Sequence, residues 1–545
     1  MKNKQWQLNR KGEYIRVEMD VIANKIDIVG FDSYHGGFQY ELIIGENIEK
    51  KYHQVSLKDY PQEKILLFRF YYPGRVETAI AIVSMKYQGN HAGYKALPLV
   101  IFKRDILDLS EYPMKNYLVC ACKIFDQEYK IVYQFIDLRR CHIKSLRMKL
   151  PPDIYKVRLI KYPEANFVVA IETSRNQDVA SILHLDSNGG IKRNTFSYHD
   201  DEVSSYYFGV NSKTSIYLVQ VTDQGSIIYG INETRCDLVH KFHGFYTHKL
   251  MFKSNLLEIQ GIKDGSTIPS KIKIDNTGKG VKCQSSCIFP STVKTKLLTG
   301  LTFDKKKVDL PLVFSTHLED LSRKTSVLYF YGSYGRPVSL LDHPWFNNEY
   351  NDIAVNCYIL LMPGGAEYGP KWHQKGVSHK YVQQREWIKL AIEYINSIKE
   401  NNEKLILETN SAGAVAAISY YKEEGNVDGI ILTSPFLHLS SVLSNQRPEL
   451  LDKQDQYEWQ DINDDDSSLS LSNKCSDFAP ILIFSGEHDV ITPRKKIVEW
   501  VKLNQAANVK PIDIVDIASG GHGLSQYDSV SASNQKLRFL EGIFR

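Results

Sequence analysis

The stretch Lys404–Tyr421 constrains the fold of this chain most, because it predicts a buried strand, a tight turn and a helix in direct succession. The strand is Leu405–Glu408, Ser411 lies at the turn, and the small residues that follow leave its hydroxyl uncovered. This layout is typical of a nucleophile elbow, in which the turn lifts a serine clear of the sheet. The first backbone N–H groups of the helix point back at the serine and suit a developing oxyanion.

The elbow pattern is imperfect, because Thr409 stands at the first glycine of the usual G-x-S-x-G sequence. The motif alone leaves two interpretations of Ser411 open. The serine is either a catalytic nucleophile or an ordinary helix N-cap, a role in which serine is common. Residues elsewhere in the chain have to decide between them.

From residue 291 to the end, predicted strands alternate with helices. Between Lys380 and Glu400 the apolar residues recur at helical spacing. Thr492 and Pro493 predict the start of a later helix, which runs to about Asn508. This alternation predicts a mostly parallel, doubly wound sheet with helices on both faces and with its chemistry at the carboxyl ends of the strands. The predicted strands are Ser326–Tyr331, Ala354–Leu361, Leu405–Glu408, Gly429–Thr433, Pro480–Ser485 and Pro511–Asp516.

Residues 1–290 instead predict almost only short strands, separated by turn-forming residues such as those at 187–190 and 222–225. Many short strands are typical of a sandwich, a barrel or a propeller. No sharp repeat chooses among these three, although about six or seven propeller blades would fit the length. We therefore predict an all-β domain at 1–290 and a catalytic domain at 291–545. The clearest predicted strands are Lys25–Gly30, Phe38–Ile44, Ile65–Tyr71, Thr78–Val83, Tyr117–Cys122, Asn166–Ile171 and Ser215–Gln220.

Two further residues lie directly after predicted strands and complete a chemical pattern with Ser411. Asp489 follows the strand that ends at Ser485, and His522 lies between glycines after the last strand. The chain order Ser, Asp, His is that of α/β-hydrolases. In such a triad the histidine accepts the serine proton, and the aspartate orients the imidazole and stabilises the imidazolium. The catalytic interpretation is therefore favoured over three unrelated loop residues.

Other acids and histidines are weaker candidates. Asp513 and Asp516 are closer in sequence to the histidine of the triad, but they lie within or at the end of the last strand. His488 is expected to point away or to make a local hydrogen bond. His373 and His438 follow earlier strands and are minor candidates for touching a substrate.

Composition excludes several classes of partner. The 545 residues carry a formal charge of +4, which is too slight to favour nucleic acid or an anionic membrane. No apolar run approaches the roughly 20 residues that span a bilayer, and the N-terminal residues lack the apolar segment of a signal peptide. The eight cysteines form no C-x-x-C pair, so we expect thiols in a cytoplasmic protein with no metal or other cofactor. Cys120 and Cys122 are expected on opposite faces of one strand.

Beyond the triad, the second half of the chain resembles the prolyl oligopeptidase family of serine peptidases, and most closely its oligopeptidase B branch. The motifs that carry the resemblance are Tyr331–Gly335, Gly364–Gly369 with Trp372 and His373, Asn410–Gly413, Gly486–Asp489 and Gly520–Gly523. Lys307–Phe314 also looks like the strand with which the family's catalytic domain begins. The resemblance implies an α/β-hydrolase domain, preceded by a seven-bladed β-propeller that filters out folded proteins.

The resemblance also assigns two donors to the oxyanion. Tyr331 matches the tyrosine whose hydroxyl donates to it, together with the backbone N–H of Ala412. A phenol at the end of a buried strand and a helix N-terminus are two preorganised donors. The alternative for Tyr331 is a core aromatic residue with a satisfied hydroxyl.

Four positions depart from the family pattern. Thr409 and Ala414 replace glycines, and both add bulk where the elbow is tightest. Pro363 stands where the family usually has an arginine before Gly-Gly. Ile491 stands where the family has an arginine, two residues after the catalytic aspartate, that is thought to hold a substrate carbonyl. The last departure affects the usual anchoring of a peptide and leaves the acyl-transfer residues in place.

The substrate preference depends on the segment that follows the elbow. In the oligopeptidase B branch, acidic residues after the elbow select Lys or Arg before the cut. Here Asp455, Glu458 and Asp461 are the candidates for such an acidic pocket, and Trp459 is the candidate for an apolar wall. A preference for basic residues is one expectation, and a preference for proline or an apolar residue is the alternative.

Together these residues predict a serine peptidase that hydrolyses short peptides through an acyl-enzyme. Its base must be neutral to accept a proton, so activity should fall when His522 is protonated. One alternative is an esterase or a peptide-modifying acyltransferase of the same fold, which Ile491 motivates. Another is a propeller binding protein with a decayed hydrolase half, which Thr409 and Ala414 motivate and an intact triad opposes.

Overall fold

The computed structural model of the chain describes most strands and helices and part of the loops. The described residues are 4–10, 13–20, 25–32, 36–43, 54–60, 65–71, 78–84, 86–88, 91–95, 105–110, 114, 117–126, 128–137, 142–150, 154, 156–161, 166–173, 178–185, 191–196, 205–211, 216–231, 236–253, 256–263, 269–275, 286–287, 294–303, 306–316, 325–338, 355–377, 380–399, 402–437, 458–459, 479–486, 489, 491–505, 511–517, 522 and 526–543.

The chain divides into two compact units. The first unit comprises residues 1–200, 211–217 and 231–236, and the second comprises residues 201–210, 218–230 and 237–545. All residues of the candidate site belong to the second unit. The predicted domain boundary near residue 290 stays a prediction.

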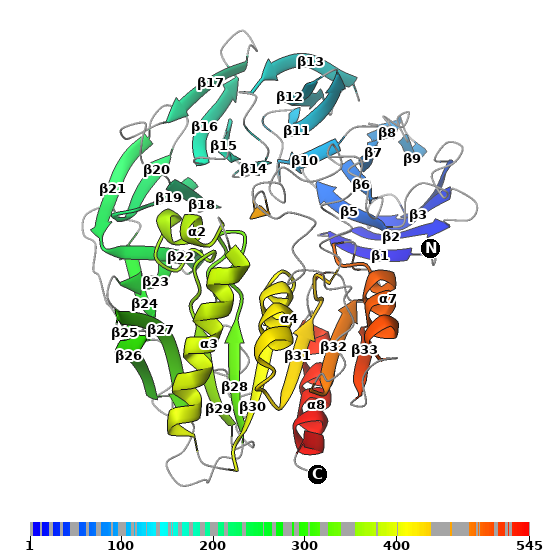
Figure 1. Cartoon of the computed structure of the whole chain (residues 1–545). Coiled ribbons are helices and arrows are strands. Elements are labelled where there is room, and N and C mark those ends of the chain that lie inside the picture. Colours follow the sequence, from blue (N-terminus) through cyan, green and yellow to red (C-terminus); the bar gives the residue numbers. More distant parts are fainter. Residues whose placement is uncertain are drawn as a thin grey trace. The chain divides into compact units, whose positions relative to one another are not determined.

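Up to residue 287 the described elements are all strands, as the sequence predicted (Figure 1). They form sheets in which strands adjacent in sequence pair with one another. The predicted strands in this part are confirmed, with ends that differ by a few residues. The first four-stranded sheet contains β1 (Lys4–Arg10), β2 (Glu13–Asp20), β3 (Lys25–Asp32) and β4 (Gly36–Ile43). The next two contain β10 (Asp105–Leu109), β11 (Tyr117–Asp126), β12 (Glu128–Asp137) and β13 (His142–Lys149), and β14 (Lys156–Ile160), β15 (Phe167–Thr173), β16 (Asp178–Leu185) and β17 (Ile191–Phe196). The last two contain β18 (Ser205–Asn211), β19 (Ile216–Thr222), β20 (Gly225–Ile231) and β21 (Cys236–His243), and β22 (Phe245–Lys253), β23 (Leu256–Lys263), β24 (Pro269–Asp275) and β25 (Ser286–Cys287). A three-stranded sheet contains β5 (Gln54–Tyr60), β6 (Ile65–Tyr71) and β7 (Thr78–Ser84), and β8 (Lys86–Gln88) pairs with β9 (His91–Lys95).

Strand β11 corrects one expectation about the cysteines. Cys120 and Cys122 were predicted on opposite faces, but their Sγ atoms lie 3.9 Å apart. Residues two apart on a strand share a face, so the prediction was wrong. Both thiols are fully buried and, like those of Cys236 and Cys357, they are not in disulfides.

The second unit contains one mixed sheet of eight strands, in the order β26-β27-β29-β28-β30-β31-β32-β33 (Figure 1). Every neighbouring pair from β29 to β33 is parallel, whereas β27 is antiparallel to both β26 and β29. The mostly parallel sheet predicted from the sequence is therefore present. The strands are β26 (Lys294–Phe303), β27 (Lys306–Thr316), β28 (Thr325–Phe330), β29 (Val355–Leu360), β30 (Lys404–Asn410), β31 (Gly429–Thr433), β32 (Ile481–Gly486) and β33 (Ile512–Ile517).

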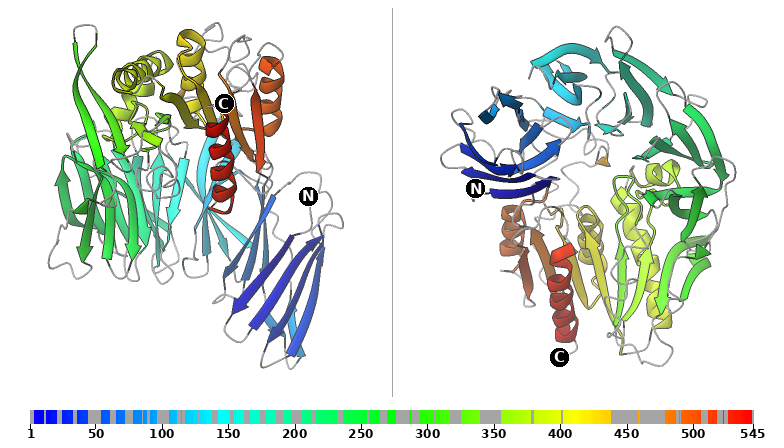
Figure 2. Two further views of the ribbon diagram at one scale, coloured as in Figure 1. Left: turned by 90° about the horizontal axis from the view of Figure 1, so that it is seen from below. Right: turned by 180° about the vertical axis from the view of Figure 1, so that it is seen from behind.

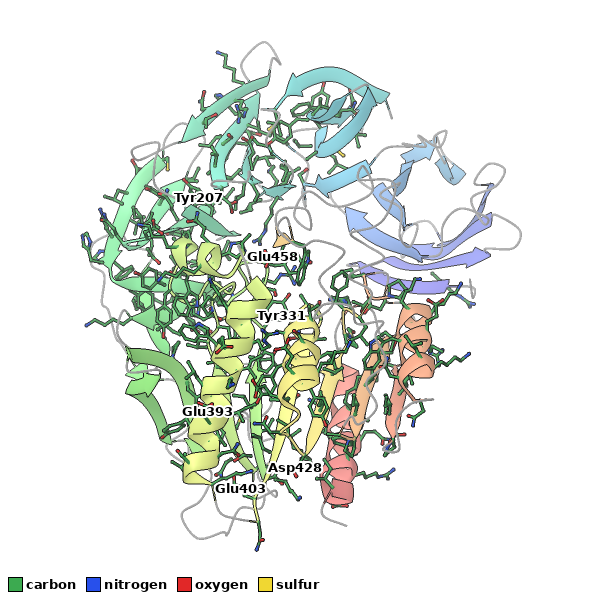
Figure 3. The ribbon with its side chains drawn as sticks, viewed as in Figure 1. Tyr207, Tyr331, Glu393, Glu403, Asp428 and Glu458 are labelled. Atoms are coloured by element: carbon green, nitrogen blue, oxygen red, sulfur yellow. The ribbon has the colours of Figure 1, made fainter. Side chains whose placement is uncertain are left out.

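Parallel pairing brings the carboxyl ends of these strands to one edge of the sheet. Phe330 at the end of β28 lies opposite Thr409, and Asn410 at the end of β30 lies opposite Thr433. Figure 3 shows Tyr331, which follows β28, at the end of the sheet opposite Glu403 and Asp428, which precede β30 and β31. The loops that carry the predicted triad leave from the same edge as Tyr331.

Helices cover both faces of this sheet (Figure 2). The helices are α2 (Pro370–Val377), α3 (Lys380–Ile398), α4 (Gly413–Glu424), α7 (Arg494–Gln505) and α8 (Gln526–Ile543). Successive side chains of β30 point to opposite faces of the sheet. Glu408 pairs with Lys536 of α8, whereas the next side chain, Thr409, lies against Gly413 of α4. None of the helices that the structure describes is long and apolar enough to cross a bilayer.

The buried ion pair between Glu408 and Lys536 attaches α8 to the elbow strand. Both side chains are 5% exposed, so removal of one partner leaves a charge buried without compensation. We predict that Lys536→Met lowers the free energy of unfolding by about 3–5 kcal/mol, measured by urea denaturation. The double variant Lys536→Met, Glu408→Leu replaces both charges by apolar groups and should recover most of that loss. Equal stability of Lys536→Met and the wild type would contradict this account.

Candidate active site

The turn after β30 holds Ser411 in a backbone conformation that residues other than glycine rarely adopt. Its φ is 47°, in the left-handed region, and its N–H donates to the carbonyl of Thr433 at 2.9 Å. Strain of this kind persists only where neighbouring structure enforces it, and it is typical of functional sites. The predicted strand, turn and helix are therefore all present, with Ser411 at the apex.

Thr409, the departure from the elbow pattern, is accommodated by a glycine one helical turn later. Its hydroxyl donates to the carbonyl of Phe330 at 2.6 Å and so ties the elbow to the strand that precedes Tyr331. A Cβ at Gly413 would lie only 2.1 Å from Thr409 Oγ1, so the threonine fits because Gly413 has no side chain. The threonine side chain at the elbow thus forms a hydrogen bond that links β30 to β28.

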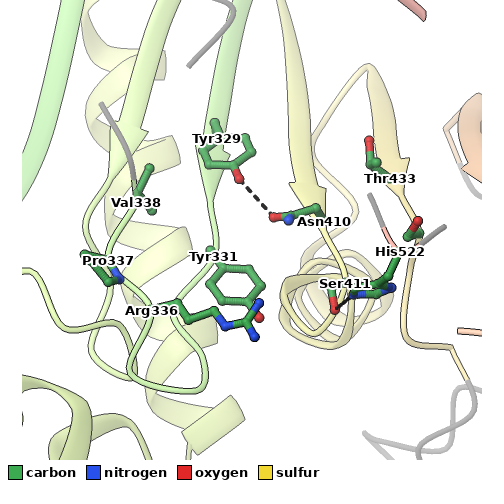
Figure 4. Close-up of a pocket in the computed structure, with 10 residues that line it drawn as sticks. Tyr329, Tyr331, Arg336, Pro337, Val338, Asn410, Ser411, Thr433 and His522 are labelled. Atoms are coloured by element: carbon green, nitrogen blue, oxygen red, sulfur yellow. Dashed lines mark hydrogen bonds between the residues drawn. The ribbon is translucent and has the colours of Figure 1, made fainter. Parts of the chain in front are cut away.

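The structure brings the three predicted triad residues into one chain of hydrogen bonds. His522 Nε2 lies 2.9 Å from Ser411 Oγ, and His522 Nδ1 lies 2.9 Å from Asp489 Oδ2. The carboxylate can only accept, so Nδ1 carries the proton and Nε2 is the acceptor for the serine hydroxyl. Figure 4 shows the imidazole of His522 reaching the hydroxyl of Ser411 from the loop after β33.

Asp489 is held by the loop that follows it. Its Oδ1 accepts the backbone N–H groups of Ile491 at 2.9 Å and Thr492 at 2.8 Å, and its Oδ2 accepts the Thr492 hydroxyl at 2.6 Å. Burial by itself would raise the pKa of Asp489, but the hydrogen bonds from His522 and Thr492 outweigh it and lower the pKa. The aspartate therefore stays ionised beside the imidazole.

Tyr331 and Ala412, the predicted oxyanion donors, come from two different elements next to the serine. Tyr331 follows β28 and lines a pocket of about 240 Å³ together with Ser411 and His522 (Figure 4). Ala412 is the residue before the first turn of α4. At the pocket wall the Tyr329 hydroxyl donates to Asn410 Oδ1 at 2.9 Å. The arrangement offers a phenol and a helix N-terminus beside one hydroxyl.

The loop at 331–338, called here the Tyr331 loop, is anchored by the short segment Glu458–Trp459. The N–H of Tyr334 donates to Glu458 Oε1 at 2.6 Å, and His373 lies 2.9 Å from Glu458 Oε2. Trp459 Nε1 donates to the Tyr334 hydroxyl at 3.0 Å, and its ring lies 5.9 Å from that of Phe436. Both oxygens of Glu458 are thus engaged in holding backbone and imidazole.

These contacts bear directly on the predicted substrate pocket. Glu458 is fully buried and Trp459 is 2% exposed, and neither is among the described residues that line the pocket at Ser411. Figure 3 shows Glu458 at the same end of the sheet as Tyr331. Asp455 and Asp461 lie outside the described residues. Within the described part of the chain, no predicted acid therefore faces the serine.

The weaker candidates for the triad can also be located. Asp516 makes a two-pronged ion pair with Arg494, with distances of 2.5 and 2.7 Å, and Asp513 is exposed. His438 and His488 lie outside the described residues. No group of three or more His, Cys, Asp or Glu side chains among the described residues is arranged to hold a metal ion.

Sequence reasoning missed the second anchor of the Tyr331 loop, Glu367. Its Oε1 accepts the backbone N–H of Val338 at 2.9 Å, and its own carbonyl lies 2.9 Å from His248 Nε2. Burial lowers the pKa of His248 to about 4, so the imidazole is neutral and donates to that carbonyl. Burial also raises the pKa of Glu367 to about 7, although hydrogen bonds from Val338 oppose the shift. A glutamate inside the Gly364–Gly369 motif was the signal available in the sequence.

The raised pKa of Glu367 predicts a pH-dependent stability. The folded state holds the proton more tightly than the unfolded state, so this contribution is full below pH 4.5 and is lost as the pH rises through about 7. Glu367→Gln keeps an acceptor for Val338 and cannot ionise. Urea denaturation should therefore show that, between these pH values, the free energy of unfolding of Glu367→Gln rises relative to that of the wild type, by up to about 3 kcal/mol. Parallel stability curves for the two proteins would contradict the assignment.

Comparison with curated proteins shows partial relatives. No family model matches the chain. The prolyl endopeptidase-like protein of Rattus norvegicus is 26% identical over 260 residues, and that of Gallus gallus is 24% identical over 275 residues. The matches cover 44% and 45% of this chain but only 35% and 37% of those proteins. The chain thus spans little more than a third of the length of the curated relatives it matches.

Solved structures resemble the chain over nearly its whole length. Oligopeptidase B from Leishmania major covers 99% of this chain with a TM-score of 0.60 and 13% identity, and the match covers 86% of that structure. Prolyl oligopeptidase B from Galerina marginata covers 98% with a TM-score of 0.59 and 10% identity, over 88% of its own chain. At such identities the likeness concerns the fold alone. Oligopeptidase B and prolyl oligopeptidase B are both matched, so the predicted likeness to the oligopeptidase B branch in particular stays a prediction. The comparisons in sequence and in fold confirm that this chain resembles the prolyl oligopeptidase family of serine peptidases.

Proposed function

We propose that this chain is a serine peptidase that cleaves short peptides through an acyl-enzyme on Ser411. The observation that carries the proposal is the continuous hydrogen-bond chain from Asp489 through His522 to Ser411, with 2.9 Å at each link of the histidine. Three residues from three separate loops meet in this geometry, which a helix N-cap serine would not need. The Galerina marginata structure is described as bound to a 35mer substrate, which supports a peptide as the ligand.

In the proposed reaction Ser411 Oγ attacks the carbonyl carbon of the scissile bond while His522 Nε2 takes its proton. Asp489 stays ionised and stabilises the imidazolium, in keeping with its lowered pKa. The tetrahedral intermediate collapses when the imidazolium gives its proton to the leaving amine. Water, activated by the same imidazole, then hydrolyses the ester to Ser411 and restores the triad.

The negative charge on the substrate oxygen would be met by the Tyr331 hydroxyl and the N–H of Ala412. Tyr331 lines the same pocket as the serine, and Ala412 opens the helix next to it. Donors of this kind act strongly because they are already oriented and partly shielded from water. The hydrogen bonds of Tyr334 to Glu458 and of Val338 to Glu367 would keep the Tyr331 loop in place during the reaction.

For the architecture we propose an α/β-hydrolase domain at 291–545 and a β-propeller at 1–290. The strand order of the mixed sheet and the triad at its carboxyl edge support the first. The successive four-stranded sheets before residue 287 support the second, since propeller blades are four-stranded sheets. The cytoplasmic location expected from the sequence stays a prediction.

An esterase or peptide-modifying acyltransferase remains the second candidate, because of the loop after Asp489. Ile491 is 56% exposed, so an apolar side chain stands there in place of a charged anchor for a peptide. Turnover of matched amide and ester substrates with the same acyl group separates the two activities. A peptidase should cleave both, whereas an esterase should cleave the ester and leave the amide intact.

The proposal is tested by the hydrolysis of short fluorogenic peptides. Ser411→Ala should abolish turnover, and Tyr331→Phe, which removes one hydroxyl, should lower kcat by about 10²-fold with little change in KM. Arg538→Met on the exposed face of α8 is the control and should retain wild-type kinetics. Turnover that persists in Ser411→Ala would refute the proposed nucleophile, and an unchanged kcat in Tyr331→Phe would remove the tyrosine from the oxyanion site.

A further inference from the structure

The pocket beside Ser411 contains a cation that the proposed chemistry does not use. Arg336 lines this pocket together with Ser411, His522 and Tyr331. Figure 4 shows its side chain extending from the loop toward the ring of Tyr331, on the side of the pocket where the serine lies. At about 240 Å³ the pocket is small, so a group bound next to the serine also lies near the guanidinium.

The charge around Arg336 is one-sided in the part of the pocket that the structure describes. The lining residues are otherwise neutral or hydroxyl-bearing side chains and His522, and no Asp or Glu is among them. Within the described residues, no salt bridge to Arg336 is formed. A planar guanidinium of this kind matches a carboxylate, which it can bind through two parallel hydrogen bonds.

Glu458, which is the one predicted acid of the substrate pocket that lies within the described residues, is already engaged by other groups. Glu458 is fully buried, and its two oxygens accept from the N–H of Tyr334 and contact His373. Release of Glu458 to a substrate would leave those two groups unsatisfied, at a cost of about 1–3 kcal/mol for each buried donor. Ile491, on the Asp489 side, is exposed and uncharged. Among the described residues, the site thus presents one cation, Arg336, and no free carboxylate.

The backbone on both sides of Arg336 is fixed, so its side chain starts from a defined position. The Tyr334 N–H is held by Glu458 and the Val338 N–H by Glu367. The Gly335 N–H donates to the carbonyl of Gly364 at 3.0 Å. The Arg336 side chain itself is exposed, so binding of a carboxylate would order this side chain but would not have to order the loop backbone.

We propose that Arg336 is a specificity residue that binds a carboxylate of the peptide next to the scissile bond. The inference rests on the proposed peptidase function and adds its substrate class: peptides with Asp or Glu at the cut, or with a free C-terminal carboxylate close to it. Both sources share one chemistry, a carboxylate within reach of both Ser411 Oγ and the guanidinium. A basic residue at this position is disfavoured by like charge.

The test compares kcat/KM for fluorogenic peptides that differ only by Glu, Gln or Lys before the cut, with both ends blocked. The wild type should prefer Glu over Gln on the order of 10- to 100-fold, as for a hydrogen bond between charged partners. Arg336→Met should lose this ratio, Arg336→Lys should retain part of it, and Arg336→Glu should shift the preference to Lys. Ratios within one protein sample do not depend on its folded fraction.

A second set of peptides distinguishes the two sources of the carboxylate. These peptides carry neutral side chains and end, one or two residues after the cut, either in a free carboxylate or in an amide. A preference for the free acid that Arg336→Met removes assigns the C-terminal carboxylate, and a preference only in the first set assigns the acidic side chain. Arg538→Met on α8 removes the same charge outside the pocket and should keep every preference.

Binding separates failure of this inference from failure of the proposed function. The affinity of Ser411→Ala protein for the Glu and Gln peptides, measured by calorimetry, does not require turnover. If no peptide is cleaved but the Glu peptide binds on the order of tenfold more tightly through Arg336, the carboxylate site stands and the peptidase proposal fails. No carboxylate preference in the wild type, or a preference that survives in Arg336→Met, would overturn the inference.

Discussion

The site depends on one geometric constraint, which is that parallel strands end together at one edge of a sheet. Ser411 follows β30, Asp489 follows β32 and His522 follows β33, and only this alignment lets the imidazole reach both partners at 2.9 Å. The buried pair of Glu408 with Lys536 fixes the elbow strand to α8. The left-handed conformation of Ser411 is sustained by this framework, because an isolated turn would relax out of it.

A second set of contacts ties the oxyanion side of the site to the nucleophile. Thr409 donates to the carbonyl of Phe330 at 2.6 Å, which couples the turn at Ser411 to the strand that ends before Tyr331. The substitution that most weakened the elbow pattern in the sequence therefore has a structural role, and Gly413 makes it possible. Departures from a motif are informative only together with the residues that compensate for them.

The features that could be predicted from the sequence are those that depend on hydrophobic periodicity and on the residues at strand ends. The buried strands, the mostly parallel sheet and the loops of Ser411, Asp489 and His522 follow from apolar runs and the residues directly after them. The role of Glu458 could not be predicted, because its partners Tyr334 and His373 are 124 and 85 residues away in the chain. Arg336 carries no motif at all, and only the folded loop brings it into the pocket.

The central claim is that Ser411 is an activated nucleophile, and labelling with a fluorophosphonate probe tests it most directly. The modified residue is located by mass spectrometry in the wild type and in Ser411→Ala. The account predicts that the wild type carries a single phosphonylated serine, Ser411, and that Ser411→Ala takes up no probe. A folded wild-type protein that takes up no probe, or takes it up on another serine, would contradict the account.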